Sequence, residues 1–183
     1  MGNELTTLQG DMELGKVFAE SGLFPDIKSA SQGLVKVLAG KELGLSPIQS
    51  LNSFYFVNGR IGIVAQTMGA LIKNSKKYDY EIKEHTVEVC EIAFYRIDSD
   101  KKELIGSSKF GKVEAAKSGV INKDNYKNYP MNMYFARALS NGARWFCPDA
   151  ISAFYTVEEL QDIEPIKPTT TTIELKNEQV SNG

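Results

Sequence analysis

The stretch from Tyr129 to Leu160 constrains the fold most, because it combines a long helical pattern with a single polar face. Pro130 suits the first turn of a helix, where its missing N–H would have no partner in any case. Pro148 ends the helix, since proline cannot continue one. Most positions between the two prolines are apolar or small. The polar positions recur at i, i+3, i+4 and i+7 and therefore share one face: Arg137, Ser140, Asn141 and Arg144.

This pattern predicts a mostly buried helix with two guanidinium groups about two turns apart on its only polar face. Arginine suits bidentate contacts with phosphate, so the pair is a candidate site for a nucleic-acid backbone. The alternative is that both arginines pair with carboxylates on a solvated face. The pattern by itself favours neither interpretation.

Upstream, the sequence changes from helical to strand patterns. The opening to about Gly10 is polar and predicts a loose segment, and residues 12–21 predict a short amphipathic helix. Capping-box spacing at Ser29 and at Ser46 opens two further helices. FYFV and RIGIV then flank Asn58-Gly59, the strongest two-residue signal for a β-hairpin.

A second group of strand patterns follows the hairpin. Residues 66–77 return to the helical period, after which residues 78–97 and 103–110 alternate as three strands of an antiparallel meander. Residues 112–118 predict a short helix. Residues 122–128 predict a polar loop that leads to the long helix.

The sequence therefore predicts an α+β fold. Its parts are N-terminal helices, a β-hairpin, an antiparallel three-stranded meander and a long helix packed across the meander. We expect residues 1–160 to form one domain and the polar, acidic residues 161–183 to form a disordered tail.

Composition excludes several classes of protein. Hydrophobic residues make up 42% of the 183 positions and charged residues 24%, as in ordinary soluble domains. No apolar run approaches the roughly 20 residues that cross a bilayer, and no secretory signal opens the chain, so we expect a cytoplasmic protein without membrane contact. Two cysteines and one histidine give no zinc site, and no phosphate-binding loop is present, so we expect neither a cofactor nor ATP hydrolysis. Nothing in the sequence indicates an enzyme.

Charge is distributed unevenly along the chain. The net charge is −2, yet the segment from Arg60 to Trp145 holds 15 Lys and Arg against 10 Asp and Glu. A basic middle region suits a polyanionic partner. Aromatic residues are interleaved with these cations, and single-stranded nucleic acid binding uses this combination of stacking platforms and positive charge.

Two kinds of contact with nucleic acid are predicted in a groove between the long helix and the sheet. Basic side chains would neutralise phosphates without reading bases, although a basic helix C-terminus is also expected from the helix dipole alone. Tyr126 and Tyr129, in the polar loop, would stack on bases, whereas Trp145 and Phe146 are expected in the core. The candidate residues are Lys73, Lys76, Lys77, Lys109, Lys112, Tyr126, Tyr129, Arg137, Asn141 and Arg144.

Another function is suggested by Asp79, Glu81 and Lys83, which faintly resemble the carboxylate-and-lysine pattern of metal-dependent nucleases. Such a site needs at least two acids that converge on one magnesium ion. These three residues would share one face of a strand, and that arrangement is equally expected on the solvent side of a half-buried sheet. A magnesium-dependent nuclease and an oligomeric interaction protein that has lost DNA binding are therefore the alternative functions.

Order and motifs together resemble the phage RecT-type single-strand annealing proteins, part of the superfamily that includes Red-beta. The similarity covers roughly Leu34 to Leu160. ELGLSPIQSLNSFYFV is similar to the LGL-x-P segment of that family, and RIGIVAQTMGALIKNSKKYDYEI to its strand-helix-strand unit. CEIAFYRIDSDKKELIGSSKF resembles its β-hairpin, and NMYFARALSNGARWFCPDAISAFYT its long helix.

The resemblance implies a phage- or prophage-encoded protein that coats single-stranded DNA and anneals it to a complementary strand without ATP. It also implies a homo-oligomer, in ring or filament form, that holds the annealed duplex. Implied partners are a phage 5′–3′ exonuclease and the host single-stranded DNA-binding protein. Arg137 and Arg144 match basic positions of the family, whereas Asn141 is an amide where relatives tend to carry a basic residue.

Overall fold

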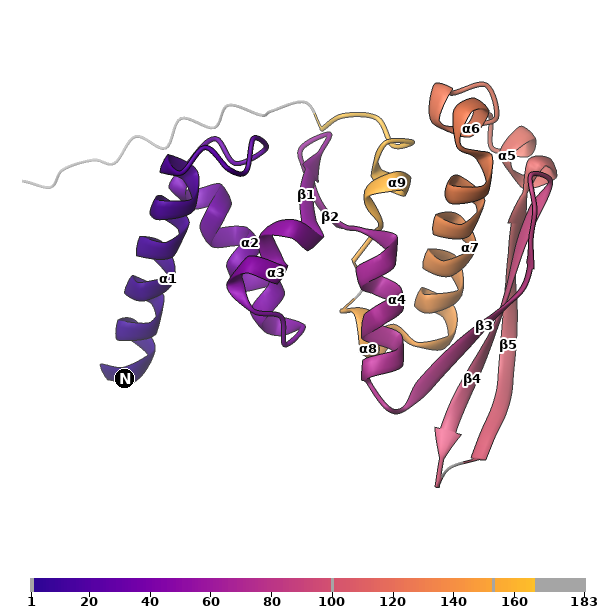
Figure 1. Ribbon diagram of the computed structural model, residues 1–183, viewed down its shortest axis with the longest axis horizontal. Helices are drawn as coiled ribbons and strands as arrows, with labels where there is room; N and C mark the ends of the chain where they lie inside the picture. The colour runs from indigo at the N-terminus through magenta and orange to yellow at the C-terminus, as the bar shows by residue number, and fades with distance from the viewer. Residues whose placement is uncertain (1, 100, 153, 167–183) are drawn as a thin grey trace, which may run out of the picture.

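A computed structural model describes residues 2–99, 101–152 and 154–166, and it confirms the predicted mixture of helices and antiparallel strands (Figure 1). N-terminal helices come first, followed by a two-stranded hairpin, a three-stranded sheet and a long helix. In this order the elements build an elongated molecule, with the N-terminal helices at one end and the three-stranded sheet at the other (Figure 1).

The N-terminal end consists of α1 (Gly2–Glu20), α2 (Ala30–Glu42) and α3 (Pro47–Ser53). Ser29 caps α2, and Ser46 forms a full capping box with Gln49 at the start of α3, as predicted. The predicted loose opening is wrong, because α1 begins at Gly2. Helix α1 packs closely on α2 at Gly15, where an added Cβ would lie 2.6 Å from the carbonyl oxygen of Ala30.

The predicted hairpin is formed by β1 (Phe54–Val57) and β2 (Arg60–Ile63). Asn58 and Gly59 both have positive φ, 52° and 78°, which is the turn geometry that matches the twist of the two strands. Helix α4 (Ala65–Asn74) follows and ends three residues earlier than predicted. Its end is fixed by Ser75, whose hydroxyl donates to the carbonyl of Ile72 and accepts from the N–H of Lys77.

The meander is a sheet of three antiparallel strands in the order β3 (Tyr78–His85), β4 (Val89–Asp98) and β5 (Lys101–Gly111). Irregularities interrupt the register between Ile82 and Glu84 and between Phe94 and Tyr95. Two short helices follow, α5 (Lys112–Lys117) and α6 (Asp124–Asn128). Residues 124–128 are thus a helix where a loop was predicted.

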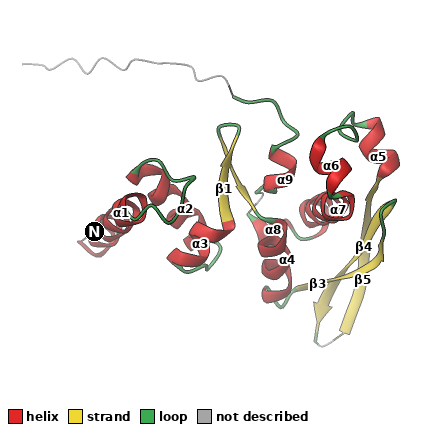
Figure 2. Cartoon of the chain, turned by 45° about the horizontal axis from the view of Figure 1, so that its top comes forward, coloured by secondary structure: helices red, strands yellow, loops and turns green. Residues whose placement is uncertain are grey.

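Helix α7 (Pro130–Phe146) covers one face of this sheet, and the other face carries no helix from the described part of the chain (Figure 2). Helix and sheet touch closely at Gly142, where a Cβ would lie 2.1 Å from a ring carbon of Phe94. The predicted groove between the long helix and the sheet is therefore wrong, because aromatic side chains fill this interface. The chain continues through α8 (Pro148–Ile151) to α9 (Val157–Leu160).

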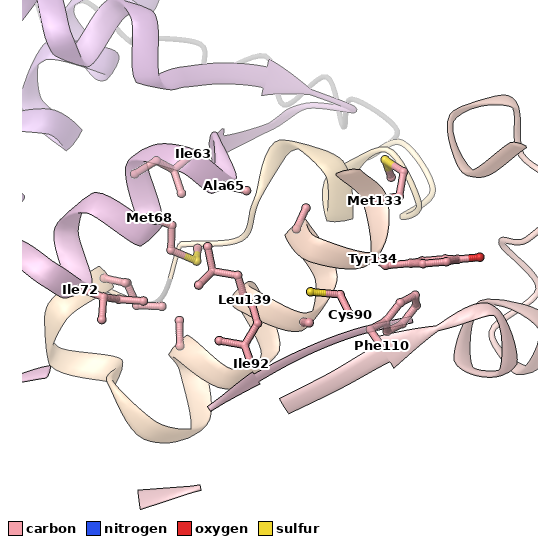
Figure 3. Close-up of a cluster of buried hydrophobic side chains, with 14 of the residues drawn as sticks. Ile63, Ala65, Met68, Ile72, Cys90, Ile92, Phe110, Met133, Tyr134 and Leu139 are labelled. Atoms are coloured by element: carbon pink, nitrogen blue, oxygen red, sulfur yellow. The ribbon is translucent and has the colours of Figure 1, made fainter. Parts of the chain in front are cut away.

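The main core lies between α4, α7 and the sheet. Leu139 of α7 lies between Met68 of α4 and Ile92 of β4, and all three are fully buried (Figure 3). Each such side chain contributes about 1.5–3 kcal/mol through the apolar surface that it removes from water. A smaller cluster around Val37 and Leu51 holds the N-terminal helices together.

We call residues 154–166, which include α9, the C-terminal segment. This segment continues past residue 160, where the domain was predicted to end. Asn58 donates hydrogen bonds to the carbonyls of Leu160 and Ile163, both 2.9 Å, and accepts one from the N–H of Ile166. The predicted disordered tail is therefore wrong for residues 161–166, because the turn of the hairpin binds them. Its remainder, residues 167–183, lies outside the described residues. Across residues 2–99, 101–152 and 154–166, no helix has the length and apolar character needed to cross a membrane.

Candidate nucleic-acid interface

The polar face of α7 is occupied by carboxylates of the C-terminal segment. Arg144 makes a bidentate pair with Glu159 of α9, with N–O distances of 2.7 and 2.8 Å. Arg137 lies 3.5 Å from Glu159 and 3.9 Å from Asp162. Of the two interpretations of this face, carboxylate pairing is the one formed, although the pairs are largely buried rather than solvated.

This cluster holds Glu159 in its charged form. Burial raises the pKa of Glu159, but hydrogen bonds from Arg144 and from the Ser140 hydroxyl outweigh burial and leave that pKa below its usual value. The Arg137 and Arg144 side chains are only 18% and 23% exposed, so a phosphate would have to compete with carboxylates that are already in place. Breaking a buried ion pair costs about 3–5 kcal/mol, so Arg137 and Arg144 chiefly hold the C-terminal segment in place.

Tyr126 and Asn141, two other candidate contacts, belong to the same cluster. Tyr126 is only 3% exposed, and its hydroxyl donates to Asp162 at 2.6 Å. The prediction that it stacks on bases is therefore wrong, because α6 turns its ring inward against Tyr134. Asn141 accepts a hydrogen bond from Arg144 through its side-chain oxygen, at 2.9 Å.

Two large aromatic side chains of the α7 region are exposed. Tyr129, just before the helix, and Trp145, near its end, are each 63% exposed. The prediction of a buried Trp145 is wrong: it follows Arg144 directly and lies beside the polar stripe, whereas Phe146 packs against Phe94 with a centroid distance of 5.5 Å. Both exposed rings could stack on a base.

The candidate lysines are accessible, in contrast to the arginines. Four of them form salt bridges of 2.7–3.7 Å with acidic side chains, yet their own side chains are 50–70% exposed. Pairs in which both partners are exposed, such as Lys77 with Asp149 and Lys112 with Glu88, stabilise a protein by only about 0–1 kcal/mol, whereas Asp79, the partner of Lys73, is only 16% exposed. Lys76 is exposed and forms no salt bridge with any residue that the structure describes. The four paired lysines are Lys73, Lys77, Lys109 and Lys112.

These lysines gather at opposite ends of the sheet. Lys109 and Lys112 lie near α5, whereas the other three lie where the chain leaves α4 and enters β3 (Figure 1). At this second end, Lys77 and Arg96 line a common hollow of about 200 Å³. We call the group at the α4–β3 junction the basic corner: Lys73, Lys76, Lys77 and Arg96.

Arg96 was not a candidate from the sequence. Its place depends on the pairing of β3 with β4, which sets it opposite Tyr78, one residue after Lys77. Acidic groups reduce the positive charge of the basic corner. Asp79 bonds to Lys73 at 2.7 Å and to Lys102 at 2.5 Å; burial raises its pKa, but these lysines and the N–H of Tyr80 lower the pKa to about 2.

The two acidic residues of the alternative nuclease site form salt bridges with lysines. Asp79, Glu81 and Lys83 do share a strand face, but Lys102 lies 2.5 Å from Asp79 and 3.7 Å from Glu81. Lys83 contacts Glu81 at 2.6 Å. Within the described ranges, no three His, Cys, Asp or Glu side chains are placed to hold a metal ion. This geometry lends no support to magnesium chemistry at the strand.

Comparison with protein-family models, curated proteins and solved structures gives no match for this chain.

Proposed function

We propose that the protein binds single-stranded DNA through its phosphates and promotes annealing to a complementary strand without ATP. The basic corner is the observation that carries this proposal. Its side chains are exposed. Lys76 has no ionic partner among the described residues, and the partner of Lys77, Asp149, is itself 48% exposed, so phosphates can take up these two cations at little cost, whereas Lys73 is held more firmly by Asp79. Arg96 adds a cation on the sheet to those at the end of α4, in a hollow that Asp98 also lines.

Binding through phosphates leaves bases free for a second strand. Each neutralised phosphate releases a counterion, which makes the affinity fall steeply with salt and keeps it independent of sequence. Tyr129 and Trp145 offer stacking surfaces that do not discriminate among bases. A strand held this way can pair with its complement while it remains bound.

The resemblance of the sequence to RecT-type annealing proteins supports the same proposal. A protomer of this size offers few phosphate contacts, so stable coating of a strand would require protomers side by side, as a ring or filament. An exonuclease that produces the single strand, a host single-stranded DNA-binding protein and a phage origin belong to the same proposal.

Annealing of two complementary fluorescent oligonucleotides without ATP, measured across a salt series, tests this function. We expect a rate enhancement that falls steeply as salt rises. Lys76→Glu should weaken single-strand binding by about tenfold and lower the salt slope by about 1. Lys16→Glu is the matched control, because Lys16 is also an exposed lysine but lies on α1. Absence of both annealing and single-strand binding at low salt would reject the proposal.

A further inference from the structure

An uncharged cavity of about 420 Å³ lies between α3 and α4, beside the basic corner. This volume falls within the range of small-molecule pockets. Helix α3 contributes Gln49 and Asn52, and α4 contributes Gln66 and Asn74. The remaining lining consists of Leu45, Ile48, Ser53, Thr67, Ala70 and Leu71.

The four carboxamides have unused hydrogen-bonding capacity. Those of Gln66 and Asn74 are exposed and form no hydrogen bond with the residues that the structure describes. Gln49 uses its oxygen in the capping box at Ser46, and Asn52 uses its nitrogen on the carbonyl of Ile48. The opposite atom of each amide remains available. The cavity therefore offers both donors and acceptors around an apolar floor.

No side chain that lines the cavity is ionisable, so the cavity itself suits an uncharged ligand. A nucleobase has the required chemistry: apolar faces for Leu71 and the half-exposed Ile48, and edges whose donors and acceptors match carboxamides. Charge beside the cavity favours the same ligand. Asn74 precedes Lys76 by two residues, so a phosphate attached to a bound base would meet the basic corner.

We propose that this amide-lined cavity holds a base of the strand whose phosphates bind the basic corner. The proposal rests on the proposed function and adds to it a base-binding subsite. Carboxamides can rotate to present a donor or an acceptor, so the subsite would accept any base. A base held here anchors the strand, while its neighbours stay free to pair.

An abasic strand separates the base contact from the phosphate contact. We expect the wild-type protein to bind oligothymidylate about tenfold more tightly than an abasic deoxyribose-phosphate strand of equal length, as measured by fluorescence anisotropy. The double substitution Gln66→Ala/Asn74→Ala should remove the part of this preference that the cavity contributes, retain the part that stacking on Tyr129 and Trp145 contributes, and leave abasic-strand binding unchanged. Asn122→Ala is the matched control, because its amide is exposed, lies between α5 and α6, and bonds to no described residue.

The outcomes distinguish the two proposals. Equal binding of both strands by the wild-type protein, or a full preference retained by the double variant, would overturn the base-binding subsite and leave phosphate binding intact. Failure of both strands to bind at low salt would overturn the proposed function itself. Circular dichroism of the double variant verifies that the fold is retained, as expected for two exposed side chains.

Discussion

Neighbouring glutamates of α9 have opposite environments. Glu159 is charged and bound to Arg144, whereas one carboxylate oxygen of Glu158 is buried without a hydrogen-bond partner among the described residues. Burial raises the pKa of Glu158 above its usual value. A single helical turn thus contains one acid that stabilises the fold when ionised and one that opposes it.

Replacement of Glu158 should reveal this cost as a pH dependence. The pKa of Glu158 is higher in the folded than in the unfolded chain. Its contribution to the stability of the fold is therefore most favourable at low pH and is lost as pH rises through the folded pKa. Glu158→Gln should therefore unfold at a higher urea concentration than the wild type at pH 7, and at a similar concentration at pH 4. Glu13→Gln, an exposed glutamate of α1, should show no such pattern. A Gln variant that is less stable at pH 7 would refute this assignment.

Arg144 offers a direct test of whether the α7 arginines bind DNA or hold α9. Arg144→Ala leaves the nearly buried Glu159 without its partner. It should cost about 3 kcal/mol in urea unfolding, the lower end for buried pairs because Arg144 is 23% exposed. Arg96→Ala, on the exposed surface of β4, should cost less than about 0.5 kcal/mol. Unchanged stability of Arg144→Ala together with lost DNA binding would instead make Arg144 a phosphate ligand.

At the scale of elements, the contact of α7 with the sheet depends on Gly142. An added Cβ would lie 2.1 Å from the Phe94 ring and 2.9 Å from the Cβ of Ser108. Gly142→Ala should therefore lower the free energy of unfolding in urea by about 2 kcal/mol, because the cost of overpacking exceeds the gain in helix propensity. Gly10→Ala is the matched control. Its Cβ would meet no described atom within 4 Å, so α1 should gain up to about 1 kcal/mol. Equal stability of the two variants would show that α7 can shift on the sheet.

The elements themselves could be predicted because their signals are local. Ser46 and Gln49 specify a helix start within three residues, and Asn58-Gly59 specifies a hairpin by the backbone angles that these two residues tolerate. Alternation along the strands was likewise sufficient to predict the antiparallel meander. In each case the deciding interactions lie within a few residues of one another.

The candidate site was less predictable because its contacts are distant in sequence. Tyr126 is bound by Asp162, 36 residues later, and Arg144 by Glu159, 15 residues later. Helical period placed Arg144 correctly on a polar face, but period does not say which element covers that face. Arg96 reaches the basic corner only through strand pairing. The amide-lined cavity likewise requires two helices to be placed side by side.

Across the whole molecule, the C-terminal segment connects the hairpin to α7. Its residues bond to Asn58 and Arg60 at the hairpin. They also bond to Arg137 of α7 and to Lys123, which precedes α6. In Figure 1, α9 lies between the hairpin and α7. Because these partners come from distant parts of the chain, the segment couples the hairpin to the helix-and-sheet unit.

Asn58 is the residue through which this coupling can be tested. Its amide nitrogen donates to the carbonyls of Leu160 and Ile163, and its positive φ limits the substitutions that the turn accepts. Asn58→Gly keeps the turn geometry and removes both bonds, at about 1–2 kcal/mol. Asn58→Asp also keeps the turn but sets a carboxylate against two carbonyl oxygens, so it should cost more. In urea unfolding, we expect the wild type to be the most stable protein, Asn58→Gly to be less stable and Asn58→Asp to be the least stable.

Hydrogen exchange would show how far the loss of these bonds extends. In Asn58→Asp, the amides of α9 and of β1–β2 should exchange faster together, because the hairpin and the C-terminal segment hold each other. Amides at the contact of α1 with α2 should keep their protection, since this contact shares no bond with Asn58. Faster exchange confined to the turn, with α9 unchanged, would mean that the contacts with α6 and α7 hold the C-terminal segment without the hairpin. In that case the position of α9 would depend on the ion pairs and hydrogen bonds of Glu159 and Asp162, and not on the hairpin.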